Sequence, residues 1–147
     1  RGAQAAAYRA QPDAAVVVDT FMAGDTPDVA YCRELPARIG AGPVLLLASG
    51  TQIGHPAMNR LLRRAAEAAG VALQPSMAAQ AGTDAGAIHV SRQGVPAAGL
   101  GLARRYSHSP VCTLDLNDAA GAVAVLEQLV TDMGPGWDLS FLGEGGN

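Results

Sequence analysis

The hydrophobic positions of this chain follow two spacings, and short runs of apolar and β-branched residues are typical of buried strands. The predicted strands are residues 14–21, 44–48, 71–77 and 97–102. Apolar residues that recur at helical spacing, or a run rich in alanine, predict helices. The predicted helices are residues 1–11, 56–69, 84–92 and 116–133. Strands that alternate with helices favour an α/β domain with a largely parallel sheet.

The two long helices each carry an apolar stripe that we expect to face the core. In helix 56–69, which opens at Pro56, the stripe is Met58, Leu61, Leu62, Ala65, Ala66 and Ala69. In helix 116–133 it is Leu116, Ala120, Val123, Leu126, Leu129 and Val130. Asn117 or Asp118 is expected to cap the second helix, because short polar side chains accept hydrogen bonds from the free N–H groups of a first turn.

Composition narrows the class of protein. With 147 residues, of which 49% are hydrophobic, the chain has the size of one domain and can bury a core. No apolar run reaches the roughly 18–20 residues of a membrane span. All ten basic residues are arginines, scattered along a chain of net charge -3. We therefore expect neither a membrane nor a nucleic acid as partner.

The two cysteines, Cys32 and Cys112, are too few and too far apart for a disulfide framework or a zinc knuckle. The amino-terminal stretch lacks the charged and then apolar layout of a signal peptide. We expect two reduced thiols in a cytoplasmic protein, and favour this over a catalytic Cys–His pair.

Two polar residues follow predicted strands, in positions where chemistry is common. Ligands of open α/β sheets bind beyond the carboxyl ends of the strands. Asp19 lies near the end of the first strand and His108 in the turn after the last, and together they would supply half of a hydrolytic zinc site. The structural alternatives stay open: Asp19 as a turn residue that caps the next segment, and His108 as a turn histidine bonded to the backbone. Asp25, before Thr-Pro, is expected to be a turn residue.

Thr83 and Asp84 follow a glycine at a predicted strand-to-helix junction. They are expected to cap helix 84–92, or to form the wall of a substrate pocket. The other two histidines are expected to be structural, with His55 at a helix start and His89 inside a helix.

The glutamates do not complete a metal site. Glu67 and Glu127 fall on solvated positions in the middle of helices, Glu34 in an irregular stretch and Glu144 in the tail. A hydrolytic metal site needs three or four ligands and a general base, and none of these residues is placed to act as that base.

Several segments, in order along the chain, resemble the carboxyl-terminal part of the M42 family of metallo-aminopeptidases, which includes glutamyl aminopeptidases and proteins described as endoglucanases. RGA resembles the residues after the family's paired-glutamate motif, and VVVDTFMAGDTP is similar to its aspartate-containing metal segment. IGAGPV, the helix at 55–70, GTDA, GVP and RRYSHSP occupy the expected places. Single pieces such as GTDA are unspecific, but the ordered series is hard to explain by chance.

The resemblance implies a zinc-peptidase-like (phosphorylase/hydrolase-like) three-layer α/β/α fold, with residues 1–147 as the carboxyl-terminal portion of the catalytic domain. It also implies two divalent ions, zinc or cobalt, with Asp19 as a ligand of one and His108 of the other. In the family the two metals activate a bridging water and a glutamate takes its proton. That general base and the remaining ligands would lie upstream of Arg1. Peptide substrates and homo-oligomers built from dimers, up to a dodecamer, are implied as partners.

Two hypotheses follow. The first is an aminopeptidase that removes N-terminal residues from peptides, of which this chain is the distal half and inactive alone. The second is a non-catalytic fragment or degenerate homologue that acts as an oligomerising or binding module. The chain also departs from the family in having Val111-Cys112 where a glutamate usually follows the histidine.

Overall fold

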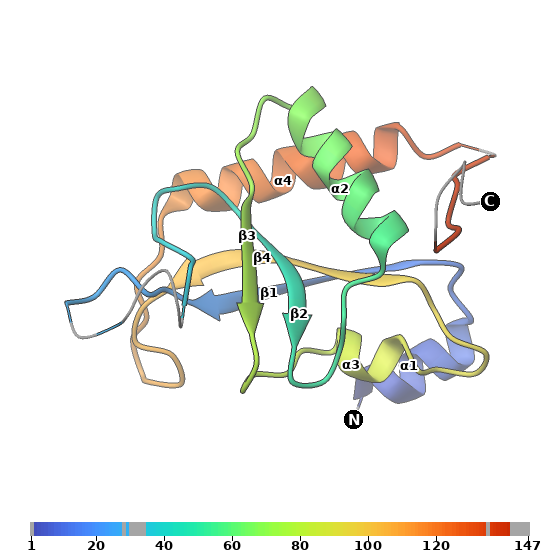
Figure 1. Ribbon diagram of the computed structural model, residues 1–147, viewed down its shortest axis with the longest axis horizontal. Helices are drawn as coiled ribbons and strands as arrows, with labels where there is room; N and C mark the ends of the chain where they lie inside the picture. Colours follow the sequence, from blue (N-terminus) through green and yellow to red (C-terminus); the bar gives the residue numbers. More distant parts are fainter. Residues whose placement is uncertain (1, 28, 30–34, 135, 142–147) are drawn as a thin grey trace.

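The computed structural model describes residues 2–27, 29, 35–134 and 136–141. Its helices and strands lie within a few residues of the predicted ones (Figure 1). They are α1 (Gly2–Ala10), β1 (Ala15–Met22), β2 (Val44–Ser49), α2 (Pro56–Ala68), β3 (Gln74–Ala78), α3 (Ala85–Ile88), β4 (Ala97–Arg104) and α4 (Leu116–Thr131). The main difference in length is α3, which has 4 residues. After it, Arg92 and Gly94 take positive φ angles of 54° and 100° and turn the chain toward β4.

The four strands form one sheet in the order β1-β4-β2-β3. β1 pairs with β4, and β2 with β3, in parallel as the sequence predicts. The central pairing of β2 with β4 is antiparallel, so the sheet is mixed. Between β2 and β3, the 13 residues of α2 carry the chain back along the sheet, so that β3 can run parallel to β2. The 4 residues of α3, between β3 and β4, are too few for such a return, and β4 runs antiparallel to β2. β1 and β4 therefore end at one edge of the sheet, and β2 and β3 end at the opposite edge.

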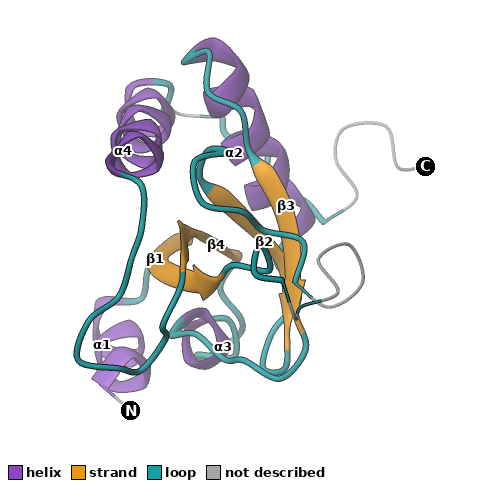
Figure 2. Cartoon of the chain, turned by 90° about the vertical axis from the view of Figure 1, so that its left-hand side faces the viewer, coloured by secondary structure: helices purple, strands orange, loops and turns teal. Residues whose placement is uncertain are grey.

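Helices cover both faces of this sheet, which confirms the expected three-layer α/β/α fold (Figure 2). α2 and α4 pack against each other over one face, and α1 and α3 lie on the other. The main core lies beneath α2 and α4. Its buried members are Leu45, Met58, Leu62, Ala65, Ala66, Ala98, Leu100, Ala122, Val125 and Leu129. No helix in the described part of the chain is long and apolar enough to cross a membrane.

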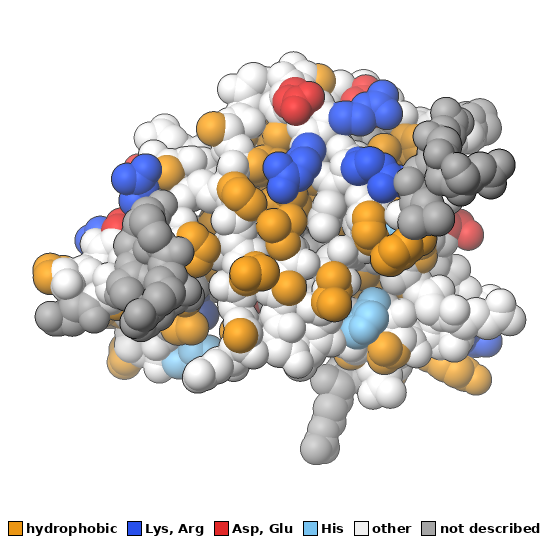
Figure 3. All heavy atoms as spheres, in the orientation of Figure 1, with side chains coloured by type: hydrophobic (Ala, Val, Ile, Leu, Met, Phe, Trp, Pro, Cys, Tyr) orange, Lys and Arg blue, Asp and Glu red, His pale blue; other side chains and the backbone are white. Residues whose placement is uncertain are grey.

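α2 buries the face that its apolar spacing predicts. Its buried residues are Ala57, Met58, Leu62, Ala65 and Ala66. On its outer side Arg63 and Arg64 are exposed, as expected for a solvated face. In Figure 3, basic side chains near the top of the molecule lie among acidic and uncharged ones.

α4 buries a different face from the one that its apolar stripe predicts. Its buried residues are Asp118, Ala122, Val125 and Leu129, which share one side of a helix. Of the predicted stripe, Leu129 alone is buried, while Leu116 is 79% and Val130 63% exposed. The prediction of this face was wrong, because it assigned the core side by hydrophobicity alone.

Asp118 explains the rotation of α4. Its side chain is buried, with Oδ1 accepting a hydrogen bond from Gly42 N and Oδ2 one from Gly40 N, both at 2.8 Å. A buried carboxylate requires such donors, so this side of α4 faces the turn before β2 and the apolar stripe turns outward. The predicted cap, Asn117 or Asp118, was also wrong. The residue that caps α4 is Asp115, whose side chain accepts a hydrogen bond from Asn117 N at 2.7 Å.

On the other face of the sheet, an aromatic ring lies over two glycines of β4. Phe21 is buried in a second cluster that includes Val44, Leu46 and Ala103. A Cβ atom added at Gly99 would lie 3.7 Å from Phe21 Cζ, and one added at Gly101 would lie 2.8 Å from Phe21 Cδ2. These two glycines therefore leave the space that the ring fills.

Candidate metal site at the ends of β1 and β4

Asp19 lies within β1, opposite Gly101 of β4. Alternate residues of a strand share a face, so Asp19 lies on the face of the sheet where the Phe21 ring packs. Its side chain is partly buried, and Oδ1 accepts a hydrogen bond from Thr20 N at 2.7 Å. Asp19 is thus a strand residue, and its structural alternative as a turn residue is wrong.

His108 lies in a tight loop that follows β4. Arg105 and Thr113 pair across the base of this loop, with hydrogen bonds of 3.0 and 3.3 Å between their backbones. Tyr106 and His108 have φ angles of 62° and 57°, a left-handed conformation that costs non-glycine residues about 1–3 kcal/mol each. Such strain is common where a side chain must be aimed at a functional site. His108 itself is exposed.

An ion pair joins the segment after β1 to the loop after β4. Arg105 Nη2 donates to Asp25 Oδ2 at 2.7 Å, and Arg105 Nε donates to Asp25 Oδ1 at 3.0 Å. Ile39 N donates to the same Asp25 Oδ2 at 3.2 Å. Asp25 is therefore structural, but it pairs with an arginine instead of forming the predicted turn. Its partner lies 80 residues away, where no local spacing reveals it. Because Arg105 begins the loop that carries His108, the pair holds this loop against the segment that follows Asp19.

This ion pair predicts a pH dependence of stability. The hydrogen bond from Arg105 is the main cause of a lowered pKa of Asp25, against an opposing effect of burial. A carboxyl whose folded-state pKa lies below its unfolded value of about 3.9 stabilises the fold above about pH 4, and this stabilisation is lost as the pH falls through the folded-state pKa. We expect Asp25→Asn to lower the free energy of unfolding by about 1 kcal/mol at pH 7, since the pair is partly exposed, and by much less near pH 2.

Urea unfolding at several pH values measures this difference. Asp13→Asn is the matched control, because Asp13 is exposed. A difference between Asp25→Asn and the unsubstituted protein that stays constant from pH 7 to pH 2 would contradict the assignment.

Thr83 and Asp84 lie in the connection that follows β3, at the edge of the sheet opposite to the ends of β1 and β4. Asp84 directly precedes α3, but its side chain makes no capping hydrogen bond, so the predicted cap was wrong. Thr83 Oγ1 is buried and has no hydrogen-bond partner among the described residues. The strand directions therefore do not bring these two residues to the edge where Asp19 and His108 lie.

His55 and His89 line one cavity of about 480 Å³. His55 directly precedes α2, as predicted, and its ring meets that of Phe141 edge to face with centroids 5.6 Å apart. Burial, with a smaller contribution from the charge of Arg60, lowers the pKa of His55, so its imidazole is neutral at pH 7. His89 Nδ1 lies 2.9 Å from Ala85 O at the end of α3.

Asp19 and His108 offer the donor types that zinc prefers, a carboxylate oxygen and an imidazole nitrogen. Within the described ranges of the chain, however, no three His, Cys, Asp or Glu residues form a group that could hold a metal ion. Two donors are fewer than the three or four protein ligands of a zinc site. The two described donors are therefore of types that bind zinc, but they are too few to hold the ion.

The remaining candidate donors do not change this result. Glu67 on α2 and Glu127 on α4 are exposed, as predicted. Cys112 is an exposed free thiol. Glu34, Glu144 and Cys32 lie outside the described residues.

Comparison with known proteins decides the family. The sequence model described as M42 glutamyl aminopeptidase matches residues 1–125. The chain belongs to the M42 family. The resemblance that RGA, VVVDTFMAGDTP and RRYSHSP carry is thereby confirmed.

Named relatives and solved structures that resemble the chain support this assignment to the M42 family. The glutamyl aminopeptidase of Lactococcus lactis subsp. cremoris (strain MG1363) is 32% identical over 133 residues, which are 90% of this chain and 36% of the relative. The TET aminopeptidase of the marine sediment archaeon Thaumarchaeota archaeon SCGC AB-539-E09 superposes with a TM-score of 0.87 at 32% identity, over 90% of this chain and 37% of that one. The TET1 peptidase of Pyrococcus horikoshii superposes with a TM-score of 0.74 at 28% identity, over 90% and 37% of the two chains. The chain spans a little over a third of the length of the curated M42 relatives that it matches, 36% to 38%.

Proposed function

We propose that residues 1–147 are the carboxyl-terminal part of the catalytic domain of a metal-dependent aminopeptidase, which removes N-terminal residues from peptides. Membership of the M42 family is the observation that carries this proposal. The relatives named above are aminopeptidases and peptidases, and both named structures share the fold of this chain.

In the complete enzyme, Asp19 would bind one of two divalent ions, zinc or cobalt, and His108 would bind the other. Such ions lower the pKa of a bound water and polarise the scissile carbonyl. In this proposal the chain holds the Asp19 and His108 side chains in position for the ions. β1 fixes Asp19 by its pairing with β4, and the ion pair of Asp25 with Arg105 fixes the base of the His108 loop.

Self-association and a cytoplasmic location belong to the same proposal. The TET1 peptidase of Pyrococcus horikoshii can assemble into a tetrahedron or a large octahedral shell. We expect this protein to form homo-oligomers built from dimers, up to a dodecamer, and to act on peptides rather than on nucleic acids or membranes. In the cytoplasm the exposed Cys112 would remain a reduced thiol.

Hydrolysis of aminoacyl anilides tests the proposal. Residues 1–147 joined to the upstream part of their reading frame should hydrolyse these substrates, lose activity with a chelator and regain it with zinc or cobalt. The 147-residue chain alone should show no turnover and bind zinc only weakly by calorimetry, because two donors do not hold two ions. Tight stoichiometric zinc with turnover by the short chain would overturn the division of the ligands.

A non-catalytic oligomerising or binding module is the second candidate. One observation favours it, namely that the described residues do not assemble a group of three metal donors. If the longer polypeptide binds no metal and remains inactive but still self-associates in light scattering, this candidate replaces the first.

A further inference from the structure

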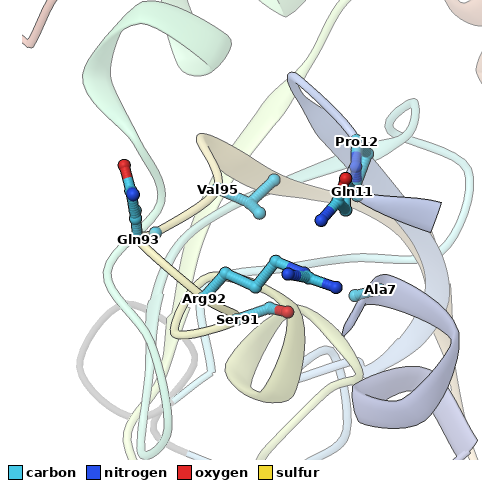
Figure 4. Close-up of a pocket in the computed structure, with 8 residues that line it drawn as sticks. Ala7, Gln11, Pro12, Ser91, Arg92, Gln93 and Val95 are labelled. Atoms are coloured by element: carbon cyan, nitrogen blue, oxygen red, sulfur yellow. The ribbon is translucent and has the colours of Figure 1, made fainter. Parts of the chain in front are cut away.

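A cavity of about 280 Å³ lies between the carboxyl end of α1 and the turn that precedes β4 (Figure 4). Its lining residues are Ala7, Gln11, Pro12, Ser91, Arg92, Gln93, Gly94 and Val95. The first strand and the last strand begin beside it, since Ala15 N donates to Pro96 O at 2.9 Å. The cavity therefore lies at the amino ends of β1 and β4, away from the edge that Asp19 and His108 occupy.

Arg92 gives this cavity its charge. Its guanidinium lies 3.9 Å from the centroid of the Tyr8 ring, and its Nε donates to Tyr8 O at 2.7 Å. These contacts with Tyr8 fix the plane of the guanidinium and engage Nε, and they leave Nη1 and Nη2 to donate to other acceptors. No acidic residue is among those that line the cavity. No residue that lines the cavity therefore neutralises the positive charge of Arg92.

Gln11 supplies the acceptor to which the two Nη groups donate. A guanidinium has only donors, so the side-chain oxygen of Gln11 must face it. In that orientation the oxygen lies 2.8 Å from Nη1 and 3.0 Å from Nη2 of Arg92. A neutral amide oxygen here occupies a place that a carboxylate can take, and a carboxylate adds ionic attraction and a bidentate geometry to the hydrogen bonds. Gln11 is exposed, so its side chain can leave this position at small cost.

Ser91 supplies a second group without a partner. The residue is 6% exposed, and Ser91 Oγ has no hydrogen-bond partner among the described residues. Figure 4 shows its hydroxyl pointing toward Ala7, on the same side as the Arg92 guanidinium. A buried hydroxyl without a partner is unfavourable, so a bound water or a ligand atom is expected there. A cation and a hydroxyl donor in one small cavity are the groups that recognise a carboxylate.

We propose that this cavity binds a small carboxylate, such as that of a free amino acid or of the carboxyl terminus of a short peptide. The carboxylate displaces the Gln11 side chain, accepts hydrogen bonds from Nη1 and Nη2 of Arg92, and accepts another from Ser91 Oγ. A volume of about 280 Å³, which corresponds to roughly nine water molecules, suits a ligand the size of an amino acid. The proposal does not depend on the metal site, because the cavity lies at the amino ends of β1 and β4, and neither Asp19 nor His108 lines it.

Calorimetric or NMR titration of the 147-residue protein tests the proposal with four probes. N-acetylglycine presents a peptide-like carboxylate, glycine a free amino acid, N-acetylglycinamide a neutral control and inorganic phosphate a different anion. One or both carboxylates should bind, and the tighter of the two identifies the source of the ligand. N-acetylglycinamide should bind at least about 10-fold more weakly, since it lacks the charge that pairs with Arg92.

Three variants locate the binding. Gln11→Glu places a carboxylate of the same shape on the guanidinium and should weaken N-acetylglycine binding at least about 10-fold. Gln11→Ala removes the competing side chain and should leave binding equal or tighter. Ser91→Ala should weaken it about 3- to 10-fold through the loss of one hydrogen bond. The Gln11 variants keep the contacts of Arg92 with Tyr8, so they avoid the risk that substitution of Arg92 unfolds the turn.

The proposal is overturned if no probe titrates, in which case the cavity holds water. Tighter binding of phosphate or of N-acetylglycinamide than of either carboxylate overturns the ligand class. Unchanged binding by Gln11→Glu overturns the location.

Discussion

Asp19→Asn and His108→Ala should each lower kcat/KM of the complete enzyme at least about 1000-fold. Loss of an outer partner of a metal ligand alone costs about 10- to 100-fold, and under the proposed function these substitutions would remove the ligand itself. Asparagine keeps the shape of Asp19 and an oxygen for the hydrogen bond from Thr20 N, so the change isolates the negative charge. His108 lies on an exposed loop, where alanine should leave the core intact.

The two variants are compared with Asp13→Asn and with the unsubstituted enzyme, by anilide hydrolysis and by metal content after dialysis. Asp13 is an exposed aspartate just before β1, so its amide should retain full activity. Each of the two variants should retain less metal than the unsubstituted enzyme, because in the proposed site Asp19 and His108 each bind a different ion. Full activity in either variant would remove that residue from the site.

Gly101→Ala should lower the free energy of unfolding by about 3 kcal/mol, the upper part of the usual range of about 1–3 kcal/mol for overpacking. The added methyl would meet the backbone oxygen of Asp19 and the ring of Phe21, whose Cδ2 would be 2.8 Å away. Both contacts are within the sheet, where backbone cannot move without breaking the pairing of β1 with β4. The ring must therefore shift out of its buried position.

Thermal and urea unfolding measure this effect. The melting temperature should fall by roughly 6–12 °C, given about 2–4 °C for each kcal/mol in a chain of this size. Gly134→Ala is the matched control, since a Cβ atom there meets nothing within 4 Å. A loss below about 0.5 kcal/mol in Gly101→Ala would mean that Phe21 does not pack on β4 as described.

The positions of the helices and strands could be predicted from the sequence, because apolar spacing and the Pro56 and Gly70 signals are local. The directions of the strands could not be predicted fully, because the alternation of elements does not show that α3 is too short for a crossover. The buried side of α4 was missed for another reason. A polar residue, Asp118, takes the core position because its partners Gly40 and Gly42 lie far back in the chain.

In the candidate site, too, features with a local sequence signal could be predicted, and contacts between distant residues could not. The sequence predicts Asp19 and His108 as metal ligands by residue type and by their places near the ends of predicted strands, and this stays a prediction. In the structure Asp19 lies within β1, and His108 lies in the loop after β4, which is parallel to β1. The ion pair of Asp25 with Arg105 could not be predicted, because the partners are distant in sequence and each is ordinary in its local setting. Arg92 was overlooked as well, and its only local signal was the Arg-Gln-Gly turn before Val95.

The place of β4 has a consequence for the order in which the protein is built. Of the four described strands, β4 is the last to be synthesised, yet it lies between β1 and β2 and pairs with both. A nascent chain can join β2 to β3 through α2 early, but β1 has no link to that pair until residues 97–104 have left the ribosome. Until then the eight mostly apolar residues of β1 have no partner among the other described strands, and unpaired strands of this kind can pair with other chains. Within this sheet, release of β4 is thus the step that removes this risk of aggregation during translation.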